Sequence, residues 1–201
     1  MKIYLLRHSQ RGHCEKQDSL TEIGKEQARR TADFFKTIKL DKIICGYKNR
    51  TKETLKPILR YQECSVEYTQ DVNEQELGIF EGKSDREFKE AIENSGLSKD
   101  EFRPEGGENR EDAYERAKIF CEKLKKENAK NLLIVSHAGF ISDLIMLFLS
   151  LPEEENVHFK TGFCAISYFD LDENFKLKDF SIGELKHLAH YSKENEKIKE
   201  L

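Results

Sequence analysis

The sequence predicts an α/β protein, a three-layer α/β/α sandwich with a mostly parallel central sheet. Short apolar runs alternate with helical patterns along the chain, which is typical of parallel strands whose connecting helices cover both faces of a sheet. Two of the runs, residues 3–6 and 132–135, are apolar throughout, as expected of strands buried on both faces. Neither an internal repeat nor a linker interrupts the 201 residues, so we expect a single domain over 1–201.

The first half of the chain alternates strand, helix, strand and helix. The strand at 3–6 precedes a helix that Thr21 can cap, because its hydroxyl accepts a hydrogen bond from the first helical turn. One face of this helix is apolar or small and consists of Ala28, Thr31, Ala32, Phe35 and Ile38. Residues 42–45 predict a second buried strand, and Pro57 kinks or ends the helix that follows it.

The middle of the chain, about 71–107, is broken by glycines into short polar pieces such as a helix over 85–92. We expect it to form a cap-like insertion of helix and loop over the carboxyl edge of the sheet. Asn109 can cap the next helix, which leads into the strand at 132–135. An apolar helix over about 140–149 follows.

The end of the chain predicts a hairpin and a charged tail. Residues 165–169 and 175–182 form two strand-like runs separated by polar turn residues. The tail, 186–201, is highly charged, and no apolar face in it indicates a partner.

Charge and cysteine content exclude several classes of protein. Lysine and arginine total 34 against 38 aspartates and glutamates, a net charge of -4, so no basic surface for nucleic acid is expected. Five cysteines without a C-x-x-C pair favour a reducing cytoplasm over a disulfide framework or a zinc ribbon. Charge appears at Arg7, too early for a secretory signal, so we expect no export. The apolar stretch 132–151 contains Asp143, which favours a buried core over a membrane span.

Polar residues follow two of the predicted strands at the point where each strand ends. Ligands of open α/β sheets bind at the carboxyl edge, and the strands at 3–6 and 132–135 deliver His8 and His137 to that edge. A neutral imidazole can attack phosphorus, and guanidinium groups such as those of Arg7 and Arg50 can hold phosphoryl oxygens. Taken singly, Arg7 could instead pair with an acidic side chain, and Arg50 could be an exposed helix charge.

Six motifs, in order along the chain, resemble those of the histidine phosphatase (phosphoglycerate-mutase-like) superfamily, in its small bacterial-type branch. The resemblance runs from residue 3 to about 170. The motifs are Leu5-Leu6-Arg7-His8-Ser9, the helix opening at 20–28, Arg50-Thr51-Lys52-Glu53-Thr54, the acidic loop at 73–82, the loop at 104–109, and Val135-Ser136-His137-Ala138-Gly139.

The resemblance implies a role for each of five residues. His8 would be the nucleophile that becomes a phosphohistidine, and Arg7, Arg50 and His137 would hold the phosphoryl oxygens, His137 as an imidazolium. Glu74 would be the general acid, kept protonated by burial, and then the base for the attacking water. Glu76 is the second choice for the acid. No metal and no cofactor are implied.

The chain departs from the family pattern after His8. Ser9 replaces the family's glycine, which would strain the backbone if that position needs a positive φ. Arg11 and Cys14 stand where many members have threonine and asparagine, so two phosphate contacts are missing. An arginine at the place of Arg11 resembles the acid-phosphatase branch, where it binds phosphate, and we expect Arg11 to compensate.

The leading hypothesis is a metal-independent phosphomonoesterase that acts on a small phosphorylated cytoplasmic compound. Two alternatives are a phosphoglycerate-mutase-like phosphotransferase and a non-catalytic module that binds phosphate or a phosphopeptide. A metallohydrolase using His8, His13, Cys14 and His137 ranks last, because no metal motif of known spacing is present. The remaining histidines, His158, His187 and His190, match no motif and are expected at the surface.

Overall fold

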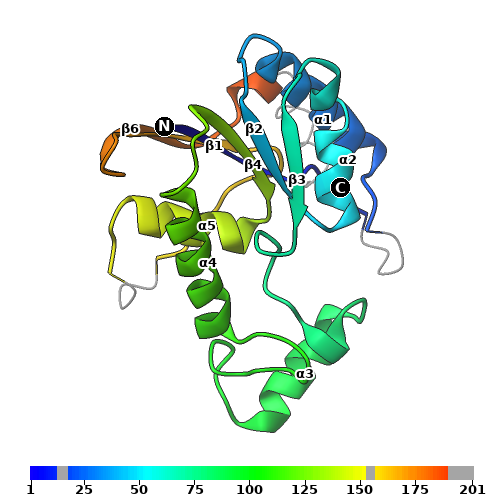
Figure 1. Cartoon of the computed structure of the whole chain (residues 1–201). Helices are drawn as coiled ribbons and strands as arrows, with labels where there is room; N and C mark the ends of the chain where they lie inside the picture. Colours follow the sequence, from blue (N-terminus) through cyan, green and yellow to red (C-terminus); the bar gives the residue numbers. More distant parts are fainter. Residues whose placement is uncertain (13–17, 153–156, 190–201) are drawn as a thin grey trace.

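The computed structural model describes residues 1–12, 18–152 and 157–189 (Figure 1). In this part of the chain one sheet has six strands in the order β3-β2-β4-β1-β5-β6. The first four are parallel: β1 (Lys2–Arg7), β2 (Lys42–Gly46), β3 (Ser65–Thr69) and β4 (Asn131–Ser136). The hairpin of β5 (Ile166–Leu171) and β6 (Leu177–Glu184) adds antiparallel strands beside β1. The predicted, mostly parallel sheet is therefore confirmed.

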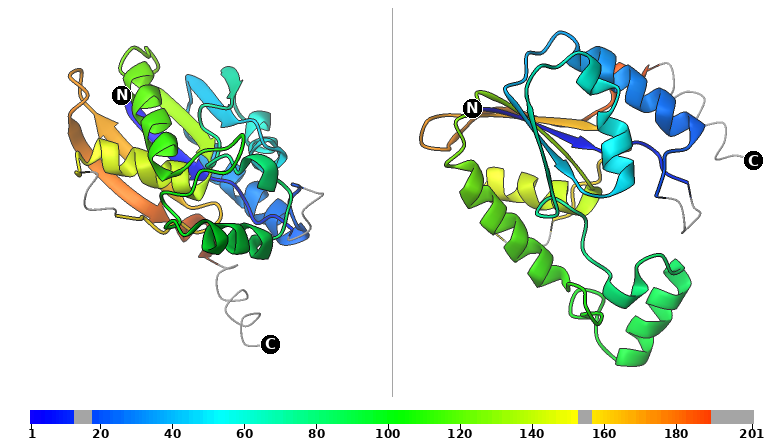
Figure 2. Two further views of the ribbon diagram at one scale, coloured as in Figure 1. Left: turned by 90° about the horizontal axis from the view of Figure 1, so that it is seen from below. Right: turned by 45° about the vertical axis from the view of Figure 1, so that its right-hand side comes forward.

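Helices cover the two faces of this sheet (Figure 2). On one face, α1 (Glu22–Phe35) and α2 (Asn49–Leu55) pack over a core that includes Leu133 and Val135 of β4. On the other face, α4 (Arg110–Leu124) and α5 (Ala138–Phe148) pack over Leu132 and Ile134 of the same strand. Successive residues of β4 thus serve opposite cores, which is why a strand between two helical layers is apolar throughout.

The predicted helix starts are correct. The Thr21 side chain accepts a hydrogen bond from the backbone N–H of Gly24 and begins α1. Asn109 and Asp112 form a reciprocal capping box at the start of α4. Helix α2 ends at Leu55, and a short 3-10 turn, η1 (Ile58–Arg60), follows Pro57.

Strand β3 was not predicted from the sequence. It lies at the edge of the sheet and its side chains are exposed or half-buried; among the described strands it pairs only with β2. An edge strand of this kind needs no apolar run, so the hydrophobic pattern carries no signal for it.

The segment between β3 and α4 lies beyond the carboxyl ends of the parallel strands, as predicted (Figure 1). It contains a 3-10 turn, η2 (Gly78–Phe80), and helix α3 (Asp85–Ser95). Aromatic rings of Phe80, Phe88 and Phe102 pack together there, with centroids 5.5 to 6.3 Å apart.

Two further expectations concern the apolar stretch and the tail. Most of the stretch 132–151 belongs to β4 and α5 and contributes to the core, and no helix in the described ranges could cross a membrane. The tail begins differently from the prediction, because η4 (Lys186–Leu188) packs Leu188 into the core. Residues 190–201, His190 among them, lie outside the described residues.

Candidate active site

His8 lies directly after β1, with its ring buried. Its backbone N–H donates to Ser136 O of β4 at 2.9 Å, which fixes the residue at the carboxyl edge of the sheet. Ring Nδ1 lies 2.8 Å from Ser9 O, and because a carbonyl only accepts, Nδ1 carries the proton. Nε2 therefore keeps a free lone pair. Burial lowers the pKa of His8 to about 3; the hydrogen bond to Ser9 opposes this and the charges of Arg50, Arg7 and Arg11 reinforce it.

His137 lies between β4 and α5, and its ring centroid is 5.2 Å from that of His8. The Arg50 Nε–H donates to His137 Nδ1 at 3.1 Å, so in the neutral ring the proton is on Nε2. That Nε2 is buried and has no hydrogen-bond partner among the described residues. Burial, assisted by the charge of Arg50, lowers the pKa of His137 well below its usual value. The expected imidazolium is thus replaced by a neutral ring, because Nδ1 is occupied as an acceptor.

Arg7, the last residue of β1, is held by two contacts. Its Nη1 donates to Thr161 O at 2.5 Å, and the guanidinium carbon lies 4.3 Å from the centroid of the Phe163 ring. Its Nε is buried without a partner in the described ranges, as is the hydroxyl of Thr161. Instead of pairing with an acidic side chain, Arg7 therefore retains an unused donor.

Arg50 is not an exposed helix charge, since its side chain is only 14% accessible. One end of the guanidinium forms an ion pair with Asp18, which also accepts from the Arg50 backbone N–H. Asp18 did not emerge from the sequence, because a single aspartate in a polar loop has no signal of its own. The pair aims Arg50 Nε at His137.

The carboxyl group of Glu74 reaches the start of α5. Its Oε2 accepts a hydrogen bond from the Gly139 N–H at 3.2 Å. A Cβ at position 139 would lie 2.3 Å from Glu74 Oε1, so a side chain there would displace this carboxyl group from its present place. Electrostatic interaction with Glu74 also opposes the lowering by burial of the pKa of Arg7. Glu74 is half-buried, which is less burial than we expected.

The carboxylate of Glu76, the alternative acid, already has partners of its own. The Asn73 side-chain amide donates to Glu76 Oε1 at 3.2 Å, and Lys48 Nζ lies 3.5 Å from its Oε2. Its carboxylate is therefore committed to loop contacts, and the geometry favours Glu74.

The loop after His8 only partly matches the expectations. Ser9 has no positive φ and so carries no strain; its N–H donates to Thr54 Oγ1, and its hydroxyl lies 2.8 Å from the thiol of Cys164. Cys164 itself has a positive φ of 57°. Arg11 is exposed and pairs through its backbone with Leu20. His13 and Cys14 lie outside the described residues.

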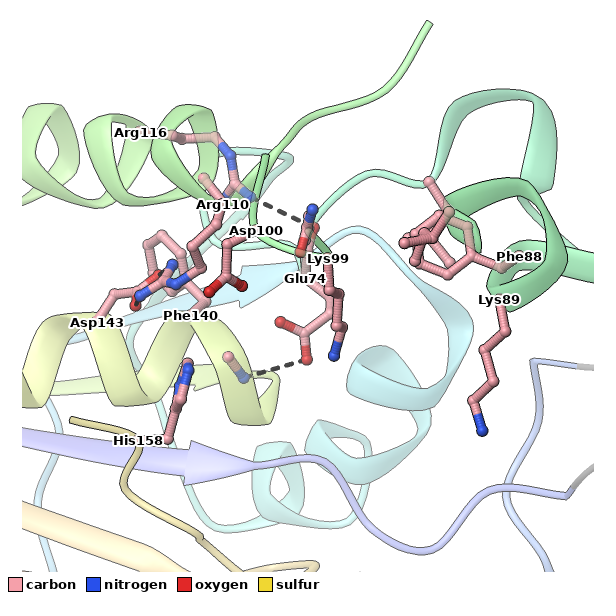
Figure 3. Close-up of a pocket in the computed structure, with 15 residues that line it drawn as sticks. Glu74, Phe88, Lys89, Lys99, Asp100, Arg110, Arg116, Phe140, Asp143 and His158 are labelled. Atoms are coloured by element: carbon pink, nitrogen blue, oxygen red, sulfur yellow. Dashed lines mark hydrogen bonds and ion pairs between the residues drawn. The ribbon is translucent and has the colours of Figure 1, made fainter. Parts of the chain in front are cut away.

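A cavity of about 540 Å³ opens beside Glu74 (Figure 3). One part of its wall is apolar and is formed by Leu77, Phe88, Ile92, Ala113 and Phe140. The charged part includes Lys89, Lys99, Asp100, Arg110, Arg116, Asp143 and the exposed His158. The cap segment and α5 thus enclose a space next to the carboxyl group.

His187 is not the surface residue that we expected. Its ring is half-buried, its Nε2 lies 3.2 Å from Thr31 Oγ1, and burial lowers its pKa to about 4. It belongs to the packing of η4 against α1, and a charged tail sequence gave no indication of this.

The fold and the geometry of the site define an α/β enzyme of the phosphoryl-transfer class. The chain belongs to the histidine phosphatase superfamily (branch 1), whose family model matches residues 3–180. This confirms the predicted family and the predicted class of enzyme.

Relatives of known name are similar over most of the chain. The adenosylcobalamin/alpha-ribazole phosphatase of Escherichia coli (strain K12) is 25% identical over 189 residues, covering 87% of this chain and 92% of that protein. The crystal structure of the alpha-ribazole phosphatase from Shigella flexneri has a TM-score of 0.78 at 24% identity and covers 92% of this chain and 96% of that one. A mycobacterial glucosyl-3-phosphoglycerate phosphatase complexed with inorganic phosphate has a TM-score of 0.73 at 19% identity, with coverages of 92% and 98%.

The tautomer of His8 gives a test that needs no substrate. Long-range ¹H–¹⁵N spectra of the free protein should show His8 protonated on Nδ1 and unchanged between pH 8 and pH 5, with His8→Asn assigning the signals. Between pH 6.5 and about 3 the unfolded ring binds a proton that the folded ring does not, so the free energy of unfolding should fall as the pH falls. A titration midpoint near 6.5 for His8 would contradict the claim that burial lowers its pKa.

Proposed function

We propose that the protein is a phosphomonoesterase that hydrolyses a small phosphorylated compound through a phosphohistidine on His8. One observation supports this most strongly. Two buried N–H donors, Arg7 Nε and His137 Nε2, lack acceptors within the described ranges, and the rings of His137 and His8 lie side by side. Buried donors without a partner are rare in native structures, and an anion is the partner that would satisfy both.

The first chemical step follows from the tautomer of His8. Its Nε2 lone pair attacks phosphorus, an N–P bond forms, and the P–O bond to the leaving group breaks. Arg7, Arg50 and the neutral His137 donate to the phosphoryl oxygens as charge redistributes. Nδ1 keeps its proton and its hydrogen bond to Ser9 O, which holds the ring in orientation.

Glu74 completes both steps. As the acid it gives its proton to the departing alkoxide, and as the base it takes a proton from the water that attacks the phosphohistidine. This second attack breaks the N–P bond, releases inorganic phosphate and restores both His8 and the protonated Glu74.

The substrate is proposed to be of metabolite size. The cavity beside Glu74, about 540 Å³, is within the range of small-molecule sites and lies where a leaving group would emerge. Arg11 is proposed to contribute a further phosphate contact. Its positive charge helps to lower the pKa of both His8 and Arg7, so it acts on the place where the phosphoryl group would lie. Four described cysteines are free thiols, which supports a cytoplasmic location.

Trapping the intermediate tests the proposal. Brief exposure to a phosphomonoester, followed by a quench that avoids acid, should place one phosphate on the peptide containing His8. His8→Ala should abolish both the label and turnover, whereas His158→Ala, a histidine at the cavity wall, should keep the label. Hydrolysis unimpaired in His8→Ala would overturn the assignment, and activity lost to EDTA and restored by a divalent ion would promote the metallohydrolase.

Leaving-group dependence identifies the acid. Glu74→Gln should slow the hydrolysis of alkyl phosphates about 10²- to 10⁴-fold but that of p-nitrophenyl phosphate much less, because nitrophenolate needs little protonation. Glu76→Gln is the matched control and should slow both substrates alike. The reverse pattern, with the selective loss in Glu76→Gln, would move the acid to Glu76.

A further inference from the structure

Arg116 of helix α4 binds the backbone of residues 71–74 through its guanidinium group. Arg116 Nη1 donates to Asp71 O at 2.9 Å and to Asn73 O at 3.0 Å. Its Nη2 donates to Glu74 O at 3.3 Å (Figure 3). These carbonyls belong to the irregular connection between β3 and η2, which forms no ladder of its own. One side chain therefore supplies hydrogen bonds that regular secondary structure supplies elsewhere.

Glu108 holds the guanidinium in place. Its two carboxylate oxygens accept from Arg116 Nε at 2.8 Å and from Nη2 at 2.9 Å, a bidentate pair in which both side chains are 19% accessible. Burial alone would raise the pKa of Glu108, but the hydrogen bonds from Arg116 and from the Glu76 backbone hold it below its usual value. Glu108 also binds the loop after Glu74 directly, because its carboxylate accepts a hydrogen bond from the Glu76 N–H at 3.0 Å.

The five donors of Arg116 are all used within the protein. Two reach Glu108 and three reach backbone carbonyls, so none is left for a ligand, although Arg116 lines the cavity. A role in binding substrate is therefore disfavoured by the geometry. The backbone contacts of Arg116 instead hold residues 71–74 in place. This segment positions the Glu74 carboxyl group, which accepts from the Gly139 N–H and must also reach the leaving oxygen.

We propose that Arg116 is a positioning residue for the general acid, acting through the backbone of residues 71–74, with Glu108 fixing its orientation. This inference rests on the proposed function, because it takes Glu74 as the acid. A displacement of about 1 Å in such a group can cost about 100-fold in rate. Lysine can replace arginine only in part here, since a single ammonium cannot reach all of the carbonyls and the carboxylate at once.

The experiment measures kcat/KM for an alkyl phosphate and for p-nitrophenyl phosphate. Arg116→Met should lower the alkyl value about 100-fold and the p-nitrophenyl value only a few-fold. Arg116→Lys should recover only part of the loss, and Glu108→Gln should show a smaller loss in the same direction. Arg103→Met is the matched control, because Arg103 pairs with Asp112 of the same helix at its exposed surface; it should leave both values unchanged.

A double-mutant cycle links the effect to the acid. If Arg116 acts through Glu74, then Glu74→Gln combined with Arg116→Met should hydrolyse the alkyl phosphate no more slowly than Glu74→Gln alone. A purely structural role would instead lower thermal stability and slow both substrates equally, which would overturn the inference. Should Arg116→Met fail to fold, the same ratio in Glu108→Gln and Arg116→Lys decides the question.

The controls separate two kinds of failure. Glu74→Gln without a selective loss would contradict the proposed function itself. A selective loss in Glu74→Gln together with none in the Arg116 and Glu108 variants would contradict this inference alone.

Discussion

The site depends on the burial of imidazole and guanidinium groups that leave hydrogen-bond donors unpaired at the ends of β1 and β4. Desolvation and mutual repulsion lower the pKa values of His8 and His137, so both rings are neutral around pH 7. Neutrality gives His8 a lone pair and gives His137 a single N–H aimed away from Arg50. The same burial makes an anion the natural partner for Arg7 Nε and His137 Nε2.

Carboxylates decide which cations remain available to that anion. Glu108 pairs with Arg116, and Asp143, which is 2% exposed, pairs with Arg110, whereas Asp18 pairs with only one end of the Arg50 guanidinium. Burial raises the pKa of Asp143, and its hydrogen bonds to Arg110 oppose this. Arg7, by contrast, is held by a backbone carbonyl and an aromatic ring, which leave its Nε unused. The difference in partners, more than the number of arginines, supports the proposed anion site beside Arg7.

The sequence predicted the elements that have strong local signals. Buried strands, capped helices and the order of the motifs identify the fold, the family and the positions of His8 and His137, because each depends on a short stretch of chain. The sequence did not predict strand β3, because an exposed edge strand needs no apolar pattern. The sequence did not predict the roles of Asp18, Arg116 and Glu108, because these roles depend on partners far along the chain. Arg116, for example, binds Asp71, which is 45 residues away.

The protonation of the site was equally beyond the sequence. That His137 is neutral follows from one hydrogen bond, Arg50 Nε to Nδ1, and from the depth of the ring. The strain expected at Ser9 is absent because its backbone does not adopt a positive φ. Both outcomes depend on how separate segments pack, which residue types alone do not determine.

Binding of orthovanadate to the otherwise unaltered enzyme tests the central claim most directly, because vanadate offers oxygens where a phosphoryl group would lie. Titration calorimetry should show one site per chain, with affinity lowered about 10- to 150-fold in Arg7→Met and in His137→Phe, since each removes a charge-assisted or buried hydrogen bond worth about 1.5 to 3 kcal/mol. Arg103→Met, which removes an ion pair with Asp112 of α4, should bind as tightly as the natural chain. Unchanged affinity in both the Arg7 and His137 variants would contradict the assignment of these two donors to the anion.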